Sequence, residues 1–263
     1  MDFLLAVVMT ALGLIGSFFS GLLGIGGAII NYPLLLFVPS AAGVADFSAQ
    51  QVSSISMFQV FFASLAGVLA FRRKQRRGQG AVVNKPLVLV MGISILLGSL
   101  LGGFGSRFLD SGVINLIYGV LAIVAVILML IPNRGSRHAE GDVSFNRTIA
   151  AVSAFLVGIV SGIVGAGGAF ILIPIMLTIL KIPTRVTIAS SLAIVFLSSI
   201  GGVIGKLTTG TLPILPILFT VIGSLIGAPI GSAVSSKLNV KYLRYGLVVL
   251  IALTAVKTWA SIL

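Results

Sequence analysis

Eight long apolar stretches, separated by short polar segments, restrict this chain of 263 residues to a membrane. A membrane span needs about 20 apolar residues, and its backbone groups must bond internally because lipid offers them no partners. The stretches are therefore predicted to be helices, which makes the chain an all-α polytopic membrane protein. They are Phe3–Pro39, Phe47–Phe71, Pro86–Phe108, Val113–Ile131, Phe145–Leu180, Thr187–Lys206, Leu212–Ser235 and Leu243–Leu263.

Composition supports the same conclusion. Only 8% of the residues are charged and the mean hydropathy is +1.22, whereas roughly 25% are charged in a soluble domain. This is too little charge for a surface that faces water. The first residues are apolar with no basic segment before them, so we expect a first span rather than a cleaved signal peptide.

The net charge of +12 is spread between the apolar stretches, with one dense run at residues 72–77. Basic residues in such positions set membrane topology and contact anionic headgroups. The expected partner of this charge is the lipid bilayer, and nucleic acid is not an expected partner.

Two of the stretches, Phe3–Pro39 and Phe145–Leu180, are too long for one crossing. Each would extend about 54 Å as a continuous helix. Each carries a glycine cluster in its middle and a proline shortly after it. We predict two short helices meeting at a glycine bend, which cross the membrane or re-enter it. The other six stretches are ordinary spans, which gives eight to ten helices.

The two broken elements repeat each other. Residues 19–36 read FSGLLGIGGAIINYPLLL and residues 160–177 read VSGIVGAGGAFILIPIML, with nine identities at a constant offset. Three further pairs follow in the same order: Ser53-Ser54 with Ser190-Ser191, Gly98-Ser99-Leu100 with Gly223-Ser224-Leu225, and Tyr118-Gly119 with Tyr245-Gly246. The chain is therefore predicted to contain two repeats, 1–132 and 145–263, joined by a cytoplasmic linker at 133–144.

The distribution of basic residues favours inverted repeats. Such residues collect on the cytoplasmic side. With the run at 72–77 inside, inversion leaves only Arg107, Lys206 and Lys257 outside, and a parallel arrangement leaves twice as many. We expect a multi-pass protein of the bacterial inner membrane with both termini periplasmic. Lys206 ends a span, so its side chain is expected to reach toward the membrane surface.

Inverted repeats with helices interrupted by Gly and Pro are typical of secondary transporters, which bind substrate at the break. Glycines let successive N–H groups turn toward one point. The next short helix is expected to start at about Ala28 or Ala169, so its positive end faces the same point. Two such sites favour an anion. The candidate substrate-binding residues are Ser20, Gly21, Gly24, Gly26, Gly27 and Ala28, and their counterparts Ser161, Gly162, Gly165, Gly167, Gly168 and Ala169.

Neutral polar side chains within the spans are further candidates, because they can bind an oxyanion and also release it. They are Asn31, Ser53, Ser54, Gln59, Ser190 and Ser191. Hydrogen bonding between helices is the alternative role of each serine. Close helix packing is the alternative for glycines four apart, such as Gly98 and Gly102.

Several absences narrow the function. All five acidic residues lie in loops or at span ends, so no intramembrane carboxylate for proton or Na⁺ coupling is evident. The chain has no cysteine, and its one histidine, His138, lies in a polar loop. No metal site, cofactor or catalytic residue is predicted, and we do not expect an enzyme.

The doubled motif SG-x-x-G-x-GGA-x-x-x-x-P, at 20–33 and 161–174, resembles the TauE/SafE family of sulfite and organosulfonate exporters. The resemblance covers essentially the whole chain. It implies a secondary transporter for a small sulfur-containing anion, working by alternating access around the two breaks. An anion channel using the same site and a non-transporting membrane scaffold are the alternatives, and a second copy of the chain is a candidate partner.

Overall fold

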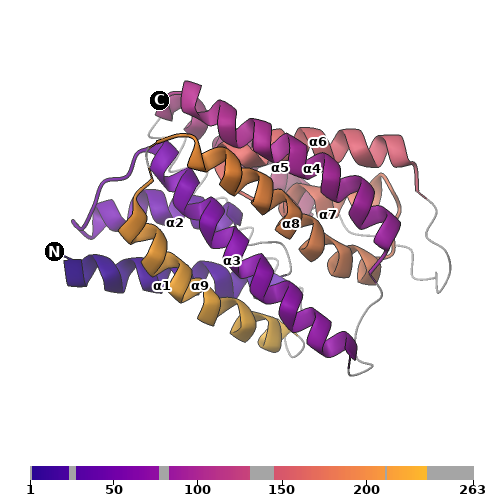
Figure 1. Ribbon diagram of the computed structural model, residues 1–263, viewed down its shortest axis with the longest axis horizontal. Helices are drawn as coiled ribbons and strands as arrows, with labels where there is room; N and C mark the ends of the chain where they lie inside the picture. Colours follow the sequence, from indigo (N-terminus) through magenta and orange to yellow (C-terminus); the bar gives the residue numbers. More distant parts are fainter. Residues whose placement is uncertain (1, 24–27, 77–82, 131–144, 211, 236–263) are drawn as a thin grey trace.

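The computed structural model describes the whole chain except residues 1, 24–27, 77–82, 131–144, 211 and 236–263 (Figure 1). The described part is helical and contains no strand. The helices are α1 (Asp2–Leu23), α2 (Ala28–Ala41), α3 (Ala49–Arg76), α4 (Lys85–Gly105), η1 (Ser106–Phe108), α5 (Ser111–Leu130), α6 (Arg147–Val164), α7 (Ala169–Thr178), α8 (Thr184–Leu207) and α9 (Ile214–Ser235).

Six of the described helices are long and apolar enough to cross a membrane, namely α1, α3, α4, α6, α8 and α9. The all-helical, polytopic fold predicted from the sequence is therefore confirmed. The predicted linker at 133–144 and the last predicted span, 243–263, lie outside the described residues.

The expectation of two short limbs in each broken element was wrong for the first limb. Helix α1 has 22 residues and α6 has 18, so they extend about 33 and 27 Å. Both approach the thickness of the hydrocarbon core, about 30 Å. Only the second limbs are short, with 14 residues in α2 and 10 in α7. The difference could have been read from the sequence, because about 20 apolar residues, enough for a span, precede each glycine cluster and far fewer follow it before the next polar segment.

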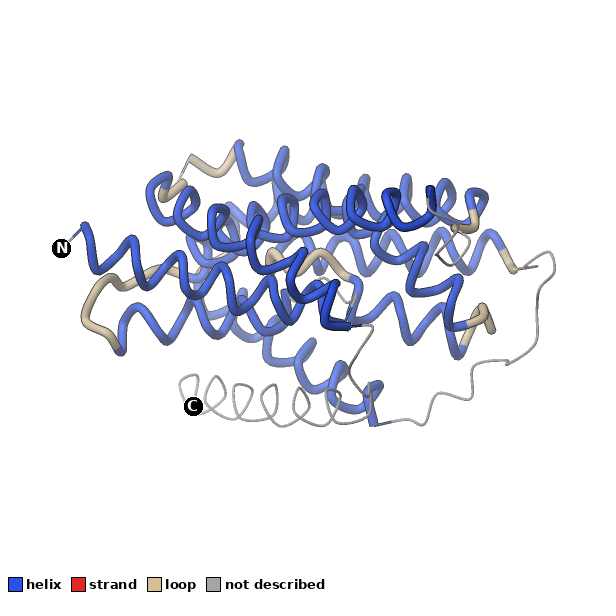
Figure 2. Tube along the Cα trace, turned by 90° about the horizontal axis from the view of Figure 1, so that it is seen from below, coloured by secondary structure: helices blue, strands red, loops and turns tan. Residues whose placement is uncertain are grey.

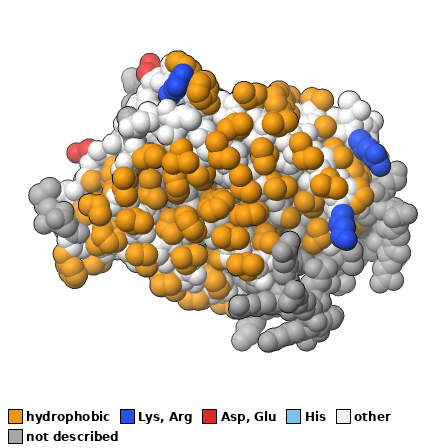
Figure 3. Space-filling model, viewed as in Figure 1, with side chains coloured by type: hydrophobic (Ala, Val, Ile, Leu, Met, Phe, Trp, Pro, Cys, Tyr) orange, Lys and Arg blue, Asp and Glu red, His pale blue; other side chains and the backbone are white. Residues whose placement is uncertain are grey.

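Apolar side chains cover the middle of the molecular surface (Figure 3). On that face, Lys and Arg and the acidic side chains appear only toward the two ends of the long axis. Many large apolar residues are exposed, including Leu89 and Leu101 of α4 and Leu218 of α9. An apolar surface of this extent is not stable in water and is expected to face lipid.

The helices run roughly along the long axis of the molecule (Figures 1 and 2). The C-terminal end of α3 and the N-terminal ends of α4, α6 and α8 lie at one end, on the right of Figure 1. The first residues of α1 and the segment between α4 and α5 lie at the other end. As a consequence, α1 and α6 run in opposite directions.

Helices from opposite halves of the chain pack tightly against each other, α1 along α9 and α4 along α6. A Cβ at Gly102 of α4 would overlap the carbonyl oxygen of Ile159 in α6, and a Cβ at Gly227 of α9 would overlap that of Leu14 in α1. The packing role considered for glycines spaced four apart is thus confirmed for Gly98, Gly102, Gly223 and Gly227. The two halves interlock rather than lying side by side.

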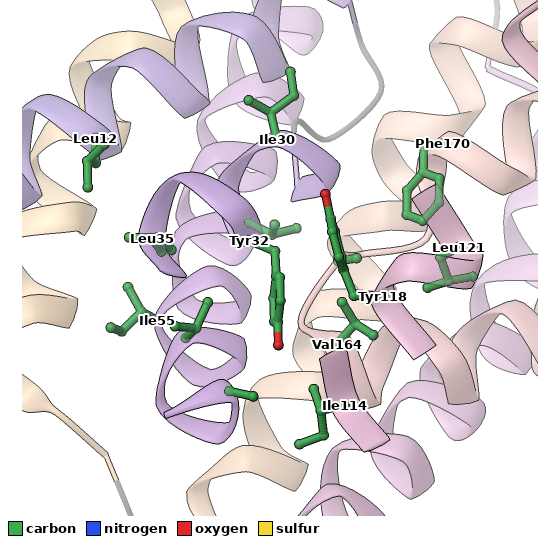
Figure 4. Close-up of a cluster of buried hydrophobic side chains, with 14 of the residues drawn as sticks. Leu12, Ile30, Tyr32, Leu35, Ile55, Ile114, Tyr118, Leu121, Val164 and Phe170 are labelled. Carbon is green, nitrogen blue, oxygen red and sulfur yellow. The ribbon is translucent and has the colours of Figure 1, made fainter. Parts of the chain in front are cut away.

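A buried cluster of apolar side chains holds the short limbs in place (Figure 4). The rings of Tyr32 in α2 and Tyr118 in α5 stack with their centroids 4.6 Å apart. The Tyr32 hydroxyl donates to Asn115 Oδ1 at 2.8 Å. Val164 and Ala169 belong to the same cluster, so the junction between α6 and α7 is anchored against α2 and α5.

Candidate functional site

The junction of α6 and α7, called here the second break, is a sharp glycine turn. Helix α6 ends at Val164 and α7 begins at Ala169, the position predicted from the sequence. The N–H groups of Gly165 and Ala166 both donate to the Ser161 carbonyl, at 2.8 and 3.0 Å, and this ends α6. Gly165, Gly167 and Gly168 have φ of 81°, 64° and 77°, a region that residues with a side chain rarely adopt.

Four successive N–H groups, those of residues 167–170, are buried at this turn. The next two, of Ile171 and Leu172, donate to the Gly168 carbonyl at 3.2 and 3.1 Å. Within the described part of the chain, no acceptor is found for the four. Buried N–H groups without a partner are rare in proteins. Such a row at the positive end of a helix is a natural site for an anion.

Side chains of α3 cover the opposite, carbonyl end of the break. Ser53 Oγ donates to the Ile163 carbonyl at 2.6 Å, and Ser56 Oγ donates to the Gly165 carbonyl at 2.9 Å. The structure thus places Ser53, a predicted site residue, directly at the second break. Because its hydroxyl hydrogen is donated to the Ile163 carbonyl, Ser53 positions the break and does not offer that hydrogen to a ligand.

Lys206 of α8 also reaches this carbonyl end. Its side chain is 0% exposed, and Nζ donates to Ser106 Oγ at 2.7 Å and to the Ile163 carbonyl at 3.0 Å. The expectation that Lys206 reaches the membrane surface was wrong. Gly202 and Gly205 bring α8 close to α4, and the lysine is enclosed between the helices.

Sequence reasoning missed Lys206 as a site residue, although one signal was present. Ser198, Gly202 and Lys206 recur at intervals of four, which places them on one face of a helix. A lysine that shares a face with serine and a packing glycine is expected to point into the bundle.

The remaining candidates near the second break divide into two groups. Ser161 is buried and its Oγ has no partner in the described structure. Its Cβ lies 3.5 Å from where a Cβ at Gly168 would stand, so its side chain adjoins the free N–H groups. By contrast, Gly162 packs on the Ser99 carbonyl of α4, and its twin Gly21 packs on the Ala228 carbonyl of α9. Contact between helices accounts for these two glycines.

The paired serines do not form one site. Ser54 Oγ donates to the Gln50 carbonyl of its own helix at 2.9 Å. Ser190 Oγ accepts the Asn84 N–H at 3.2 Å, near the start of α4. Ser191 is buried beside it in the chain. Of these three residues, the described contacts bring none to the second break.

In the first half, α1, α2 and α3 form a separate buried polar cluster. Gln59 Nε2 donates to the Gly13 carbonyl and to Ser17 Oγ, both at 3.2 Å. Asn31 Oδ1 lies against Gly16. Among the described residues, neither this oxygen nor Gln59 Oε1 has a partner. Ser20 is buried nearby on α1 and Ala28 begins α2, whereas Gly24, Gly26 and Gly27 lie outside the described residues.

Among the described residues, the second break has a buried lysine at its carbonyl end and no buried acid beside it. Asp46 and Asp110 are the acidic residues whose side chains the structure describes, and both are exposed. In the same described part, no cluster of His, Cys, Asp and Glu is suited to a metal ion. The chemistry offered is hydrogen-bond donation from backbone N–H groups beside an ammonium group.

Comparison with known proteins identifies the family. The model of the sulfite exporter TauE/SafE family matches residues 9–258. A probable membrane transporter protein of Bacillus subtilis, YunE, is 25% identical over 89% of this chain and 90% of its own length. A probable membrane transporter protein of Methanocaldococcus jannaschii is 28% identical over 92% of this chain and 89% of its own. One from Xylella fastidiosa is 31% identical over 78% of this chain and 72% of its own.

No solved structure matches the chain significantly. The family model spans nearly the whole sequence, and these relatives are all named as membrane transporters. The chain therefore belongs to the TauE/SafE family of membrane transporters.

Proposed function

We propose that the protein is a secondary transporter for a small oxyanion, most specifically sulfite or an organosulfonate, which binds at the second break. The row of four buried N–H groups at residues 167–170 carries this proposal. An oxyanion has several acceptor oxygens and suits converging N–H donors. Ser161 Oγ, also without a partner among the described residues, adjoins the same donors.

The family and the local charge support the same substrate class. The family description names sulfite, which is a small oxyanion. Lys206 is the buried charged side chain of the described structure, and it contacts the break through the Ile163 carbonyl. A buried cation favours an anionic ligand over a cationic one.

The transport assay uses purified protein in liposomes with sulfite, sulfate, thiosulfate, sulfoacetate and taurine. We expect uptake of labelled sulfite or an organosulfonate, accelerated when the same anion is present on the opposite side. Such trans-stimulation is typical of a carrier, whereas fast flux without it would indicate a channel. If none of these anions crosses faster than in protein-free liposomes, the proposed function is wrong.

Alternating access is proposed to rest on inverted halves in the bacterial inner membrane, with both termini periplasmic. The opposite directions of α1 and α6 support this topology. So does the position of basic residues, since Lys85, Arg147 and Lys181 all flank helix ends on the side where α3 ends.

Cysteine labelling can test the topology because the chain has no cysteine of its own. Lys181→Cys and Ala42→Cys both place a thiol at an exposed position. An impermeant maleimide added to intact cells is expected to label position 42 and to leave position 181 unlabelled until the cells are opened. Labelling at 181 in intact cells would contradict the inverted arrangement, whereas position 42 is periplasmic in both arrangements.

A further inference from the structure

Lys206 is buried, and its hydrogen bonds alone do not explain why a charged side chain is placed there. Its ammonium group has three N–H donors, and in the described structure two acceptors are found, Ser106 Oγ and the Ile163 carbonyl. Asp46 and Asp110 are exposed, so neither is buried with it. Burying an ammonium without an anionic partner is strongly unfavourable. We therefore expect the buried Lys206 to have a function that offsets the free energy lost on its burial.

The purpose follows from the electrostatics of a broken helix. The last carbonyls of α6 carry partial negative charge and the first N–H groups of α7 carry partial positive charge, each equivalent to about half an elementary charge. At a break these ends lie close together and largely cancel. Here the negative end is covered by donors from three side chains, those of Ser53, Ser56 and Lys206.

We propose that Lys206 sets the charge selectivity of the second break by offsetting the carbonyl end of α6. This leaves the N–H end of α7 as the uncancelled pole, and the break then attracts ligands in proportion to their negative charge. Lys206 acts through the Ile163 carbonyl and is thus a positioning residue rather than a direct ligand. The inference rests on the proposed function and specifies which anions the site prefers.

The first half lacks an equivalent of this lysine. The pairing of Ser53-Ser54 with Ser190-Ser191 aligns Lys206 with Leu69, an apolar residue that is 51% exposed. The polar cluster of Ser17, Asn31 and Gln59 presents unpartnered acceptor oxygens instead of a cation. The two halves are therefore expected to differ in their affinity for anions, with the charged site in the second half.

The test compares sulfoacetate with taurine, two-carbon sulfonates that share a sulfomethyl group. The second carbon is a carboxylate in sulfoacetate and carries an ammonium group in taurine, so only sulfoacetate has a second negative charge. Dissociation constants are measured on the purified full-length protein. Lys206→Gln keeps hydrogen-bond donors and removes the charge, and Lys206→Arg keeps the charge. Lys85→Met removes one charge from an exposed position and is the matched control.

We expect Lys206→Gln to weaken sulfoacetate binding by about tenfold or more and to change taurine binding far less. Lys206→Arg and Lys85→Met should resemble the unaltered protein. Equal losses for both ligands would indicate a structural role and overturn the inference, as would unchanged sulfoacetate binding. If Lys206→Gln does not fold, Lys206→Met, which has a similar length, gives the same comparison. If the unaltered protein binds neither ligand, nor sulfite, the proposed function fails and the inference fails with it.

Discussion

Leucine in place of Gly167 is expected to reduce anion transport to the level of protein-free liposomes. Gly167 has a φ of 64°, and a Cβ there would stand 2.7 Å from Val60 Cγ1 and 3.2 Å from Val195 Cγ1. Any residue with a side chain pays about 1–2 kcal/mol for this backbone conformation. A leucine side chain extends beyond Cβ into the space of these two valines, and relieving the clash is expected to rotate the N–H groups of the turn out of line. The measurement is uptake of labelled sulfite by reconstituted protein.

Gly43→Leu is the matched control for this variant. Gly43 has the same φ of 64°, but nothing lies within 4 Å of a Cβ built there. It should show the backbone penalty without the steric clash, and so transport normally with a slightly lower melting temperature. Both variants should appear in the membrane in normal amounts. Normal sulfite uptake by Gly167→Leu would refute the role of the second break in binding.

The second variant with a large expected effect changes the thermal stability of the protein rather than its transport activity. We expect Gly102→Val to lower the melting temperature of the detergent-purified protein by about 10 °C. A Cβ at Gly102 overlaps the Ile159 carbonyl oxygen, and rigid backbone cannot yield as a flexible side chain can. Overpacking costs about 1–3 kcal/mol and occasionally more, and a clash with backbone belongs at the upper end of that range. Each kcal/mol shifts the melting temperature by about 2–4 °C for a chain near this size.

Gly105→Val, on the same helix, isolates the steric effect. No atom lies within 4 Å of a Cβ at Gly105, so its melting temperature should fall far less. Gly105 is the last residue of α4 and has a helical φ of −64° and ψ of −27°, so replacing it with valine also changes helix propensity, though less than within the helix. Equal melting temperatures for the two would show that the contact between α4 and α6 does not depend on a small residue.

The sequence was sufficient to locate the helices and the start of each short limb. Hydrophobicity and the glycine clusters are local signals, so the starts of α2 at Ala28 and α7 at Ala169 were predicted correctly. The burial of Lys206 was not predicted. Its spacing from Ser198 and Gly202 indicates the direction of the side chain, but its hydrogen-bond partners, Ser106 and Ile163, are distant in the chain and are not identified by that segment.

The alignment of the repeat was also incomplete. The shared letters Gly-Ser-Leu pair Ser99 with Ser224. In the structure Gly162 packs on the Ser99 carbonyl, whereas its twin Gly21 packs on the carbonyl of Ala228. The structural counterpart of Ser99 is therefore Ala228, one helical turn after Ser224. Small residues recur every four positions in α9, so a shift of one turn preserves the packing face, and three identical letters are too few to determine the register.

For the candidate site, the sequence located the glycine turn, and the binding role of its residues stays a prediction. Gly167, Gly168 and Ala169 lie where the described residues offer the backbone N–H groups no acceptor. The serines were harder to assign because a hydroxyl both donates and accepts, and its partner is chosen by tertiary structure. Ser53 bonds to the break, whereas Ser54, the next residue, bonds within its own helix.

The interlocking of the halves also has a consequence for how the protein is made. Helix α1 is synthesised well before α9, against which it packs, because α2 to α8 lie between them in the chain. Until α9 enters the bilayer, the carbonyls of Leu14 and Phe18 lack the glycines that pack on them. Helices generally insert before they associate, so the newly made α1 must wait in lipid or beside the insertion machinery. The contact between the halves is then completed only once α9 has been made, and a chain cut before α9 leaves α1 without its partner.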